Sequence, residues 1–156
     1  MKTSKMHSTL KIAAAFAFTL LAACHGGRLE TPNGFATLGS NDAYSYRATD
    51  AKGVVLAVRT ESNDVKGNVD FWADLVDVRL REKGYAFESS EPAHTKAGLG
   101  GRQLRYLVER DGRTQRYWVT VFATKKKVVL VEAGGDKEAF DGATAMVTSA
   151  IETLEL

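Results

Sequence analysis

The chain contains very few of the residue types on which most active sites and metal sites depend. Its 156 residues include one cysteine, three histidines and two prolines. A single cysteine excludes an internal disulfide. A net charge of +2, from 21 Lys and Arg against 19 Asp and Glu, does not indicate the basic surface of a nucleic-acid-binding protein. With 44% hydrophobic and 26% charged residues, the composition is that of a globular chain and not of a disordered one.

The N-terminus has the pattern of an export signal. The first eleven residues carry three lysines and no acid, and residues 12–21 are apolar apart from one threonine. A membrane-spanning helix needs roughly 20 apolar residues, so this run is too short to cross a bilayer. A basic segment followed by a short apolar segment is typical of a secretory signal peptide. The sequence therefore predicts a cleaved signal peptide over residues 1–23.

The end of the apolar run resembles the lipobox of bacterial lipoproteins. Leu21 matches its branched position, Ala22 and Ala23 match its small positions, and Cys24 matches the lipidated acceptor. The resemblance implies cleavage between Ala23 and Cys24, and a membrane anchor of diacylglycerol plus an amide-linked acyl chain such as palmitate. The alternative is an ordinary signal peptide followed by an incidental cysteine. His25 replaces the Asp that favours inner-membrane retention in enteric bacteria, so the outer membrane, with the domain facing the periplasm, is favoured.

The rest of the chain is predicted to form a short linker and one domain. Glycine and polar residues predominate up to Asn41, which indicates a flexible tether over residues 24–41. Phe35 and Leu38 are the tether residues able to dock on the domain. Residues 42–156 are predicted to be a single α+β domain.

Apolar periodicity and turn signals predict the elements of this domain, in the order β-β-α-β-β-β-β-α. Asn68 is the expected N-cap of the first helix, and Asp136 that of the second. Asp111 and Gly112 are the strongest hairpin signal. Residues 128–131 are apolar at every position, which indicates a central strand covered on both faces. Connection by hairpins implies a mainly antiparallel sheet with helices packed on it. Strands are predicted over 44–49, 54–60, 85–89, 102–109, 116–124 and 128–133, and helices over 69–83 and 136–154.

This order of elements is similar to the PsbP-like α/β/α sandwich, which DcrB-type bacterial lipoproteins share. The stretches that carry the resemblance are 53–58, 75–85, 104–106, the hairpin 117–122 to 129–133, and 150–154. Proteins of this kind are mostly accessory or interaction modules and share no catalytic residue. The resemblance therefore implies a binding role.

Few residues are candidates for catalysis or metal binding. His94, in a predicted polar loop, is the one plausible general base, and it is more simply a solvated side chain. Glu88, Glu91 and His94 lie three residues apart, but a strand-to-loop stretch does not bring them together as a helix face would. The glycine-rich residues 98–101 precede a strand and not a helix, so a hairpin connection is favoured over a phosphate loop.

Other side-chain groups have both a structural and a functional interpretation. Asp70, Asp74 and Asp77 share one face of the predicted first helix, where a solvated surface is favoured over a metal site. Lys125, Lys126 and Lys127 form the densest charge run. They are interpreted either as a contact with the membrane or a partner, or as a charged hairpin tip that protects a sheet edge.

Four aromatic residues are expected mainly in the core, and any that is exposed would mark a partner surface. They are Phe71, Trp72, Trp118 and Phe122.

The sequence thus predicts a membrane-anchored, non-catalytic binding or accessory module of the bacterial cell envelope. Its expected partners are the membrane, through Cys24, and an envelope protein. No cofactor, metal or nucleic acid is expected. The alternatives are a small-ligand carrier with a pocket between sheet and helix and, least favoured, an enzyme.

Overall fold

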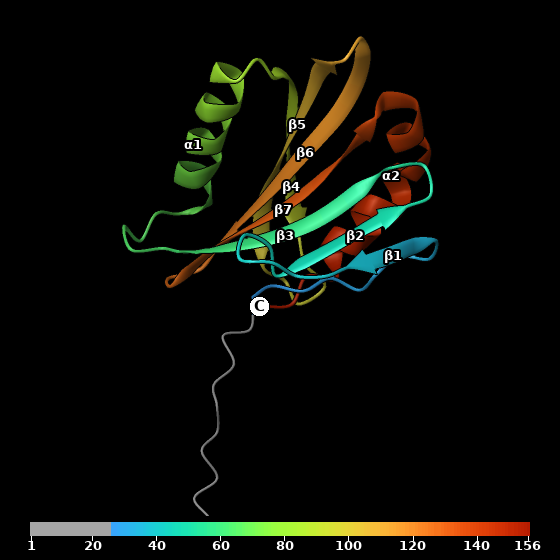
Figure 1. Ribbon diagram of the computed structural model, residues 1–156. Helices are drawn as coiled ribbons and strands as arrows, with labels where there is room; N and C mark the ends of the chain where they lie inside the picture. Colours follow the sequence, from blue (N-terminus) through green and yellow to red (C-terminus); the bar gives the residue numbers. More distant parts are fainter. Residues whose placement is uncertain (1–25) are drawn as a thin grey trace, which may run out of the picture.

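The computed structural model describes residues 26–156, so the predicted signal peptide and Cys24 lie outside the described residues. The described chain forms one seven-stranded, entirely antiparallel sheet and two helices (Figure 1). The strand order across the sheet is β1-β2-β3-β7-β6-β5-β4. The elements are β1 (Phe35–Leu38), β2 (Tyr46–Asp50), β3 (Val55–Ser62), α1 (Val69–Glu82), β4 (Ala86–His94), β5 (Gly100–Arg110), β6 (Arg113–Ala123), β7 (Lys127–Asp136) and α2 (Lys137–Glu152).

The two helices pack on opposite faces of the sheet, and β7 lies in its centre. Successive side chains of a strand point to opposite faces. Accordingly, Val129 and Val131 pack in the core beneath α2, whereas Val128 and Leu130 pack in the core beneath α1. The prediction of a central strand covered on both faces is confirmed. The α+β fold class and the mainly antiparallel sheet are confirmed as well.

Both helices begin at the predicted N-cap residues, but only one of these residues makes a capping hydrogen bond. The side chain of Asn68 accepts a hydrogen bond from the backbone N–H of Phe71 at 2.9 Å and caps α1, as predicted. Asp136 occupies the predicted N-cap position of α2, but its side chain makes no capping hydrogen bond. Arg113 donates to its carboxylate at 3.0 Å, because Asp136 ends β7 opposite the start of β6.

The segment predicted as a flexible linker is largely bound to the domain. Residues 35–38 form β1, which pairs with β2 at the edge of the sheet. Leu29 is only 6% exposed and belongs to the core beneath α2. The backbones of Arg28 and Glu155 exchange two hydrogen bonds of 2.9 and 3.0 Å. The tether prediction is therefore wrong for these residues, because strand pairing and burial of Leu29 outweigh the glycine-rich composition around them.

Strand β4 is longer than predicted, and the loop after it is shorter. It continues through Pro92 to His94, residues predicted to lie in a loop over 91–101. Proline is tolerated there because β4 is an edge strand. The remaining turn closes with a 2.9 Å hydrogen bond from the Thr95 N–H to the Leu99 carbonyl, and Gly98 adopts a φ of 86°. The expected hairpin connection in this region is thus confirmed.

The hairpin at Asp111 and Gly112 is also confirmed. Both residues have positive φ, 52° and 73°, as a two-residue turn of the primed type requires. This turn joins β5 to β6, which pair along their whole length.

Candidate functional site

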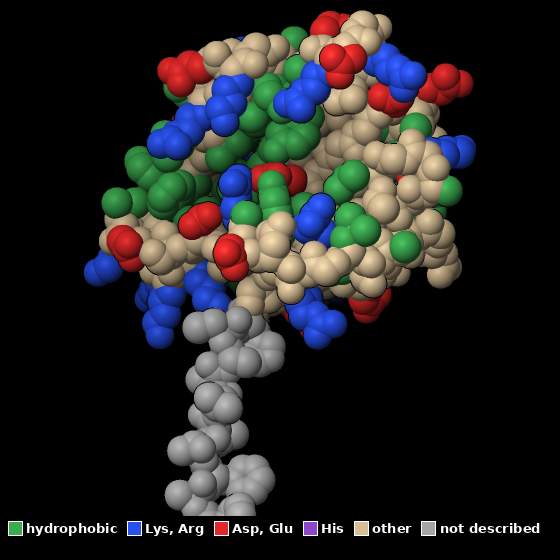
Figure 2. Space-filling model, in the orientation of Figure 1, with side chains coloured by type: hydrophobic (Ala, Val, Ile, Leu, Met, Phe, Trp, Pro, Cys, Tyr) green, Lys and Arg blue, Asp and Glu red, His purple; other side chains and the backbone are tan. Residues whose placement is uncertain are grey.

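Helix α1 covers only part of its face of the sheet, and the uncovered part forms a groove. In the described structure α1 contacts β4, β5 and β6, whereas β2 and β3 on this face have no helix above them. Figure 2 shows hydrophobic side chains gathered between α1 and the strands to its right, in a hollow with an acidic group at its centre. The hollow has a volume of about 410 Å³. We call it the groove; its principal lining residues are Tyr44, Arg47, Val55, Ala57, Tyr85, Val108, Arg110, Tyr117, Glu132 and Gly134.

The alternation of side chains along each strand determines which residues face the groove. On β3, Val55, Ala57 and Arg59 point to this face, opposite to the buried residues between them. On β7, Glu132 follows Leu130 by two residues and therefore shares its face. Because side chains alternate between the two faces of a strand, the charged Glu132 lies at the end of the apolar core beneath α1.

Glu132 is the central polar group of the groove. It is 9% exposed, and its Oε1 accepts a hydrogen bond from Nη2 of Arg59 at 2.7 Å. The hydroxyl of Tyr44 donates to its other oxygen at 3.3 Å, and Tyr117 lies near enough for the charge of Glu132 to act on its hydroxyl. A buried carboxylate needs such partners, since an unpaired charge in a poorly solvated position is costly. Nε of Arg59 is buried and has no partner among the described residues.

The tyrosines around Glu132 remain protonated donors. The negative charge of Glu132 is the largest cause that raises the pKa of Tyr44. For Tyr117 the largest cause is burial, and the nearby Glu132 raises its pKa further. Both carboxylate oxygens of Glu132 are thus engaged, one by Arg59 and the other by Tyr44.

The lining of the groove carries an excess of positive charge. It includes the side chains of Arg47 and Arg110, whereas Glu132 is the sole acid among the described residues that line it. The side chain of Arg116, another lining residue, is directed to Glu88 and Asp141 on the α2 side. Arg110 donates to the Tyr85 hydroxyl at 2.7 Å, which holds its guanidinium at the edge of the groove. The groove therefore combines apolar strand residues, a paired acid at its centre and two arginines in its lining.

Two of the four aromatic residues singled out in the sequence are core residues, as predicted. Trp118 and Phe122 are buried. Trp72 is half-buried, and its Nε1 donates to Asn63 at 3.0 Å. Phe71 is 50% exposed and contacts the Trp72 ring edge-to-face at 5.3 Å, so its assignment to the core is wrong. Its position on α1 turns it away from the residues that pack on the sheet.

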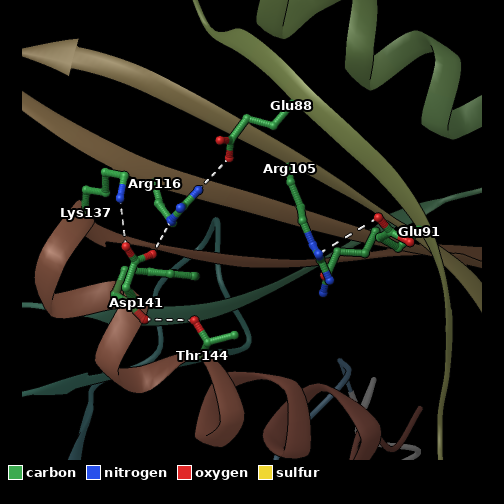
Figure 3. A network of polar contacts seen from close by, with 9 residues as sticks. Glu88, Glu91, Arg105, Arg116, Lys137, Asp141 and Thr144 are labelled. Carbon is green, nitrogen blue, oxygen red and sulfur yellow. Dashed lines mark hydrogen bonds and ion pairs between the residues drawn. The ribbon is translucent and has the colours of Figure 1, made fainter.

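A separate polar network lies on the α2 side of the sheet. Figure 3 shows Arg116 between Glu88 and Asp141, with Lys137 beside it at the other carboxylate oxygen of Asp141. Glu88 lies 2.6 Å from the Arg116 guanidinium, and Lys137 donates to Asp141 at 2.8 Å. The hydrogen bonds from Lys137 and Arg116 lower the pKa of Asp141. These contacts join α2 to the sheet, so we assign the network a structural role.

The predicted metal and catalytic candidates are not brought together. Glu88 pairs with Arg116, and Glu91 lies 4.0 Å from Arg105. His94 is exposed at the end of β4. Within residues 26–156, no three His, Cys, Asp or Glu side chains are placed to hold a metal ion.

The acids of α1 have structural partners. Asp70 and Asp74 lie 2.6 and 3.7 Å from the guanidinium of Arg102, and both are largely exposed. Asp77 accepts a 2.8 Å hydrogen bond from the hydroxyl of Tyr106, whose ring is fully buried. The solvated-surface interpretation therefore holds for Asp70 and Asp74, while Asp77 satisfies a core tyrosine.

Lys125, Lys126 and Lys127 lie at the turn between β6 and β7, as expected for a hairpin tip. Lys125 and Lys126 are exposed. Neither helix of the described chain has the length and apolar character needed to span a membrane.

Sequence reasoning did not identify the residues of the groove. Glu132 offered a signal, since it is the one charged residue within the otherwise apolar stretch 128–133. Arg59, Tyr44 and Tyr117 gave none, because nothing in their spacing links them to Glu132.

Comparison with known proteins supports the fold. No family model matches the sequence, and no curated protein matches it. The chain resembles LpqN of Mycobacterium tuberculosis, described as involved in cell envelope biogenesis, with a TM-score of 0.66 and 11% identity over 83% of each chain. It also resembles the cyanobacterial PsbP protein CyanoP of Synechocystis sp. PCC 6803, with a TM-score of 0.57 and 12% identity over 87% of this chain and 95% of that one. At such identities the likeness concerns the fold alone, and the fold is the PsbP-like sandwich expected from the sequence.

Proposed function

We propose that this protein is a lipid-anchored, non-catalytic module of the bacterial cell envelope that binds a partner protein through the groove. The partner segment would be apolar and acidic, and would insert apolar side chains between α1 and β3 while its acids face the arginines of the rim. The anchor would be Cys24, acylated after cleavage behind Ala23, most suitably in the outer membrane with the domain in the periplasm.

The observation that carries the proposal is the open apolar face of the sheet. Val55 is 38% exposed and lines the groove, on the same face of β3 as the buried Ala57. Apolar side chains on an open, concave surface with a polar rim are typical of an interaction site. The rim arginines favour an acidic partner through charge complementarity.

The envelope assignment has two supports. The first is the lipobox resemblance at the end of the apolar N-terminal run. The second is the shared fold with LpqN, a protein described as involved in cell envelope biogenesis.

The composition of the site supports the proposal that the module is not an enzyme. Glu132 is paired with Arg59 and accepts from Tyr44, and His94 lies on β4, outside the lining of the groove. The groove therefore lacks, among the described residues, a nucleophile paired with a general base.

A small-ligand carrier is the second candidate, and the size of the groove favours it. A volume of about 410 Å³ is within the range of ligand sites. The sequence led us to expect a pocket between sheet and helix. Packed side chains fill that interface under α1, and the hollow lies beside it. A ligand would bind beside α1, on the uncovered strands.

Site-specific photocross-linking in the native envelope separates the two candidates. A photoreactive residue would replace Val55 in the groove, and in a matched control would replace Met146, which is 41% exposed on α2 at the opposite face. We expect a protease-sensitive protein adduct from position 55 alone, and its loss in an Arg47→Glu background. A small-molecule adduct at position 55 would favour the carrier. Equal adducts at both positions would contradict a role for the groove.

The anchor is tested independently with Cys24→Ser. We expect this variant to lose membrane association and to be processed abnormally. A variant that stays equally membrane-bound and is processed normally would contradict the lipoprotein assignment.

A further inference from the structure

The described chain begins already bound to one end of the domain. The Gly27 N–H donates to the Thr60 hydroxyl at 3.2 Å, and the Ser45 hydroxyl donates to the Gly27 carbonyl at 2.7 Å. A methyl group on Gly27 would lie 3.1 Å from Val58 and from Leu154, so the backbone is held close against the core. Figure 1 shows this start of the described chain and the C-terminus at the same end of the molecule. We call it the basal end.

This attachment shortens the distance to a lipid anchor. Cys24 precedes Gly26 by two residues, and two residues span at most roughly 7 Å. A flexible tether of the length expected from the sequence would have reached roughly 23 Å. An acylated Cys24, which the proposed function requires, would therefore hold the basal end against the membrane surface.

Two basic turns lie at the basal end and are bonded to each other. The β6–β7 turn carries Lys125 and Lys126, and the β3–α1 loop carries Lys66. Buried Asn63 joins them, since its N–H donates to the Lys126 carbonyl at 2.9 Å and its side-chain amide donates to the Thr124 carbonyl at 2.7 Å. The positions of the lysines are thus set by the fold.

The basal end is not uniformly basic, because Asp42, Glu61 and Asp64 lie near it. Asp42 and Glu61 line a hollow of about 410 Å³ between Gly26 and the β6–β7 turn. Figure 2 shows Lys and Arg side chains projecting at this end of the domain. Lysine side chains are longer than acidic ones, so their charges can reach further from the backbone.

We infer that the basal end rests on an anionic membrane surface, with Lys66, Lys125 and Lys126 contacting lipid headgroups. Anionic headgroups attract basic residues held within a Debye length of the bilayer. A short anchor keeps these lysines within that distance. This inference rests on the proposed anchor at Cys24.

The inferred orientation also places the groove. The groove opens on the face of the sheet beside α1, and α1 and β3 extend away from the basal end (Figure 1). With the basal end on the membrane, the groove faces sideways and stays open to a protein in the same envelope layer.

Fluorescence quenching on vesicles tests the orientation. The full lipidated chain would carry a fluorophore on one introduced cysteine. The cysteine would be Ser62→Cys, at the basal end of β3, or Ala51→Cys, in the turn before β3 begins. Acylated Cys24 has no free thiol, so the label would react at the introduced cysteine alone. Vesicles of phosphatidylethanolamine and phosphatidylglycerol would contain a lipid with a quencher on its headgroup. We expect strong quenching at position 62 and little at position 51. Lys125→Glu with Lys126→Glu should reduce the quenching at position 62 by about half, whereas Lys52→Glu with Lys83→Glu, away from the basal end, should leave it unchanged.

The possible results distinguish a failure of the proposed anchor from a failure of the inferred orientation. Loss of the charge effect on vesicles of phosphatidylcholine alone would support contact with anionic headgroups. Equal quenching at positions 62 and 51 in a chain that floats with the vesicles would overturn the orientation and leave the anchor intact. A wild-type chain that does not float with the vesicles would overturn the anchor, and with it this inference.

Discussion

Arg59 on β3 and Glu132 on β7 form an ion pair of 2.7 Å across neighbouring strands at the groove. They are diagonal neighbours, because Glu132 is directly opposite Ala57 in the register. Their side chains are 37% and 11% exposed, so the acid is the more deeply buried partner.

Removal of Arg59 alone should destabilise the protein, because it leaves the Glu132 carboxylate without its cation. We expect Arg59→Met to lower the free energy of unfolding by about 1–3 kcal/mol. The double variant Arg59→Met with Glu132→Leu should regain most of this loss, since a buried ion pair can often be replaced by apolar residues at little cost. Urea unfolding of the three proteins measures both effects. A double variant as unstable as the single one would show that the pair is not the source of the effect.

Tyr106, which is buried, and Tyr117, which is half-buried, should resist ionisation. Burial is the largest cause that raises the pKa of Tyr106 and of Tyr117. Because the pKa is raised in the folded state, these groups contribute their full stabilisation below the unfolded-state pKa of about 10. This contribution is lost as the pH rises through the folded-state pKa.

Alkaline absorbance titration of phenolate checks this expectation. Of the five tyrosines, those at positions 106 and 117 should not ionise until the protein unfolds. Tyr117→Phe should reduce the fall of stability with alkaline pH. A native protein in which all five tyrosines ionise together near pH 10, as they should in denaturant, would contradict the burial of these hydroxyls.

Gly101 should tolerate no side chain. A methyl group there would lie 2.6 Å from the Phe122 ring and 2.7 Å from the Val121 carbonyl oxygen, and backbone cannot move aside cheaply. We expect Gly101→Ala to destabilise by about 1–3 kcal/mol. Gly100→Ala is the matched control, because a methyl group there meets no atom within 4 Å. Thermal unfolding of both variants makes the comparison, and equal midpoints would contradict the close approach.

Leu29 should contribute to stability although it lies in the predicted linker. It is 6% exposed, and we expect Leu29→Ala to cost about 2–3 kcal/mol. Leu38→Ala is the control, since Leu38 is 38% exposed on β1 and should cost less than about 1 kcal/mol. Chemical unfolding compares the two. Equal, small effects would mean that the segment before β1 is not docked in solution.

The local signals in the sequence predicted most elements correctly. Asn68, the turn at Asp111 and Gly112, and the apolar run 128–131 each act through neighbours close in the chain or through a simple period. Strand β1 and the extension of β4 were missed. Both are edge strands held by backbone pairing with the strand that follows them in the chain, and their own composition gives no sign of this pairing.

The sequence by itself determined the fold class and the expectation of an export signal, since both depend on patterns along the chain. Only the tertiary structure decided that α1 leaves β2 and β3 uncovered, that Tyr44, Arg59 and Tyr117 meet at Glu132, and that Gly27 is bound beside the basic turns. These contacts join residues 15 to 88 positions apart, as the pairs Glu132–Tyr117 and Glu132–Tyr44 illustrate. Their energy comes from burial and strand register, and neither is encoded in the spacing of any short motif.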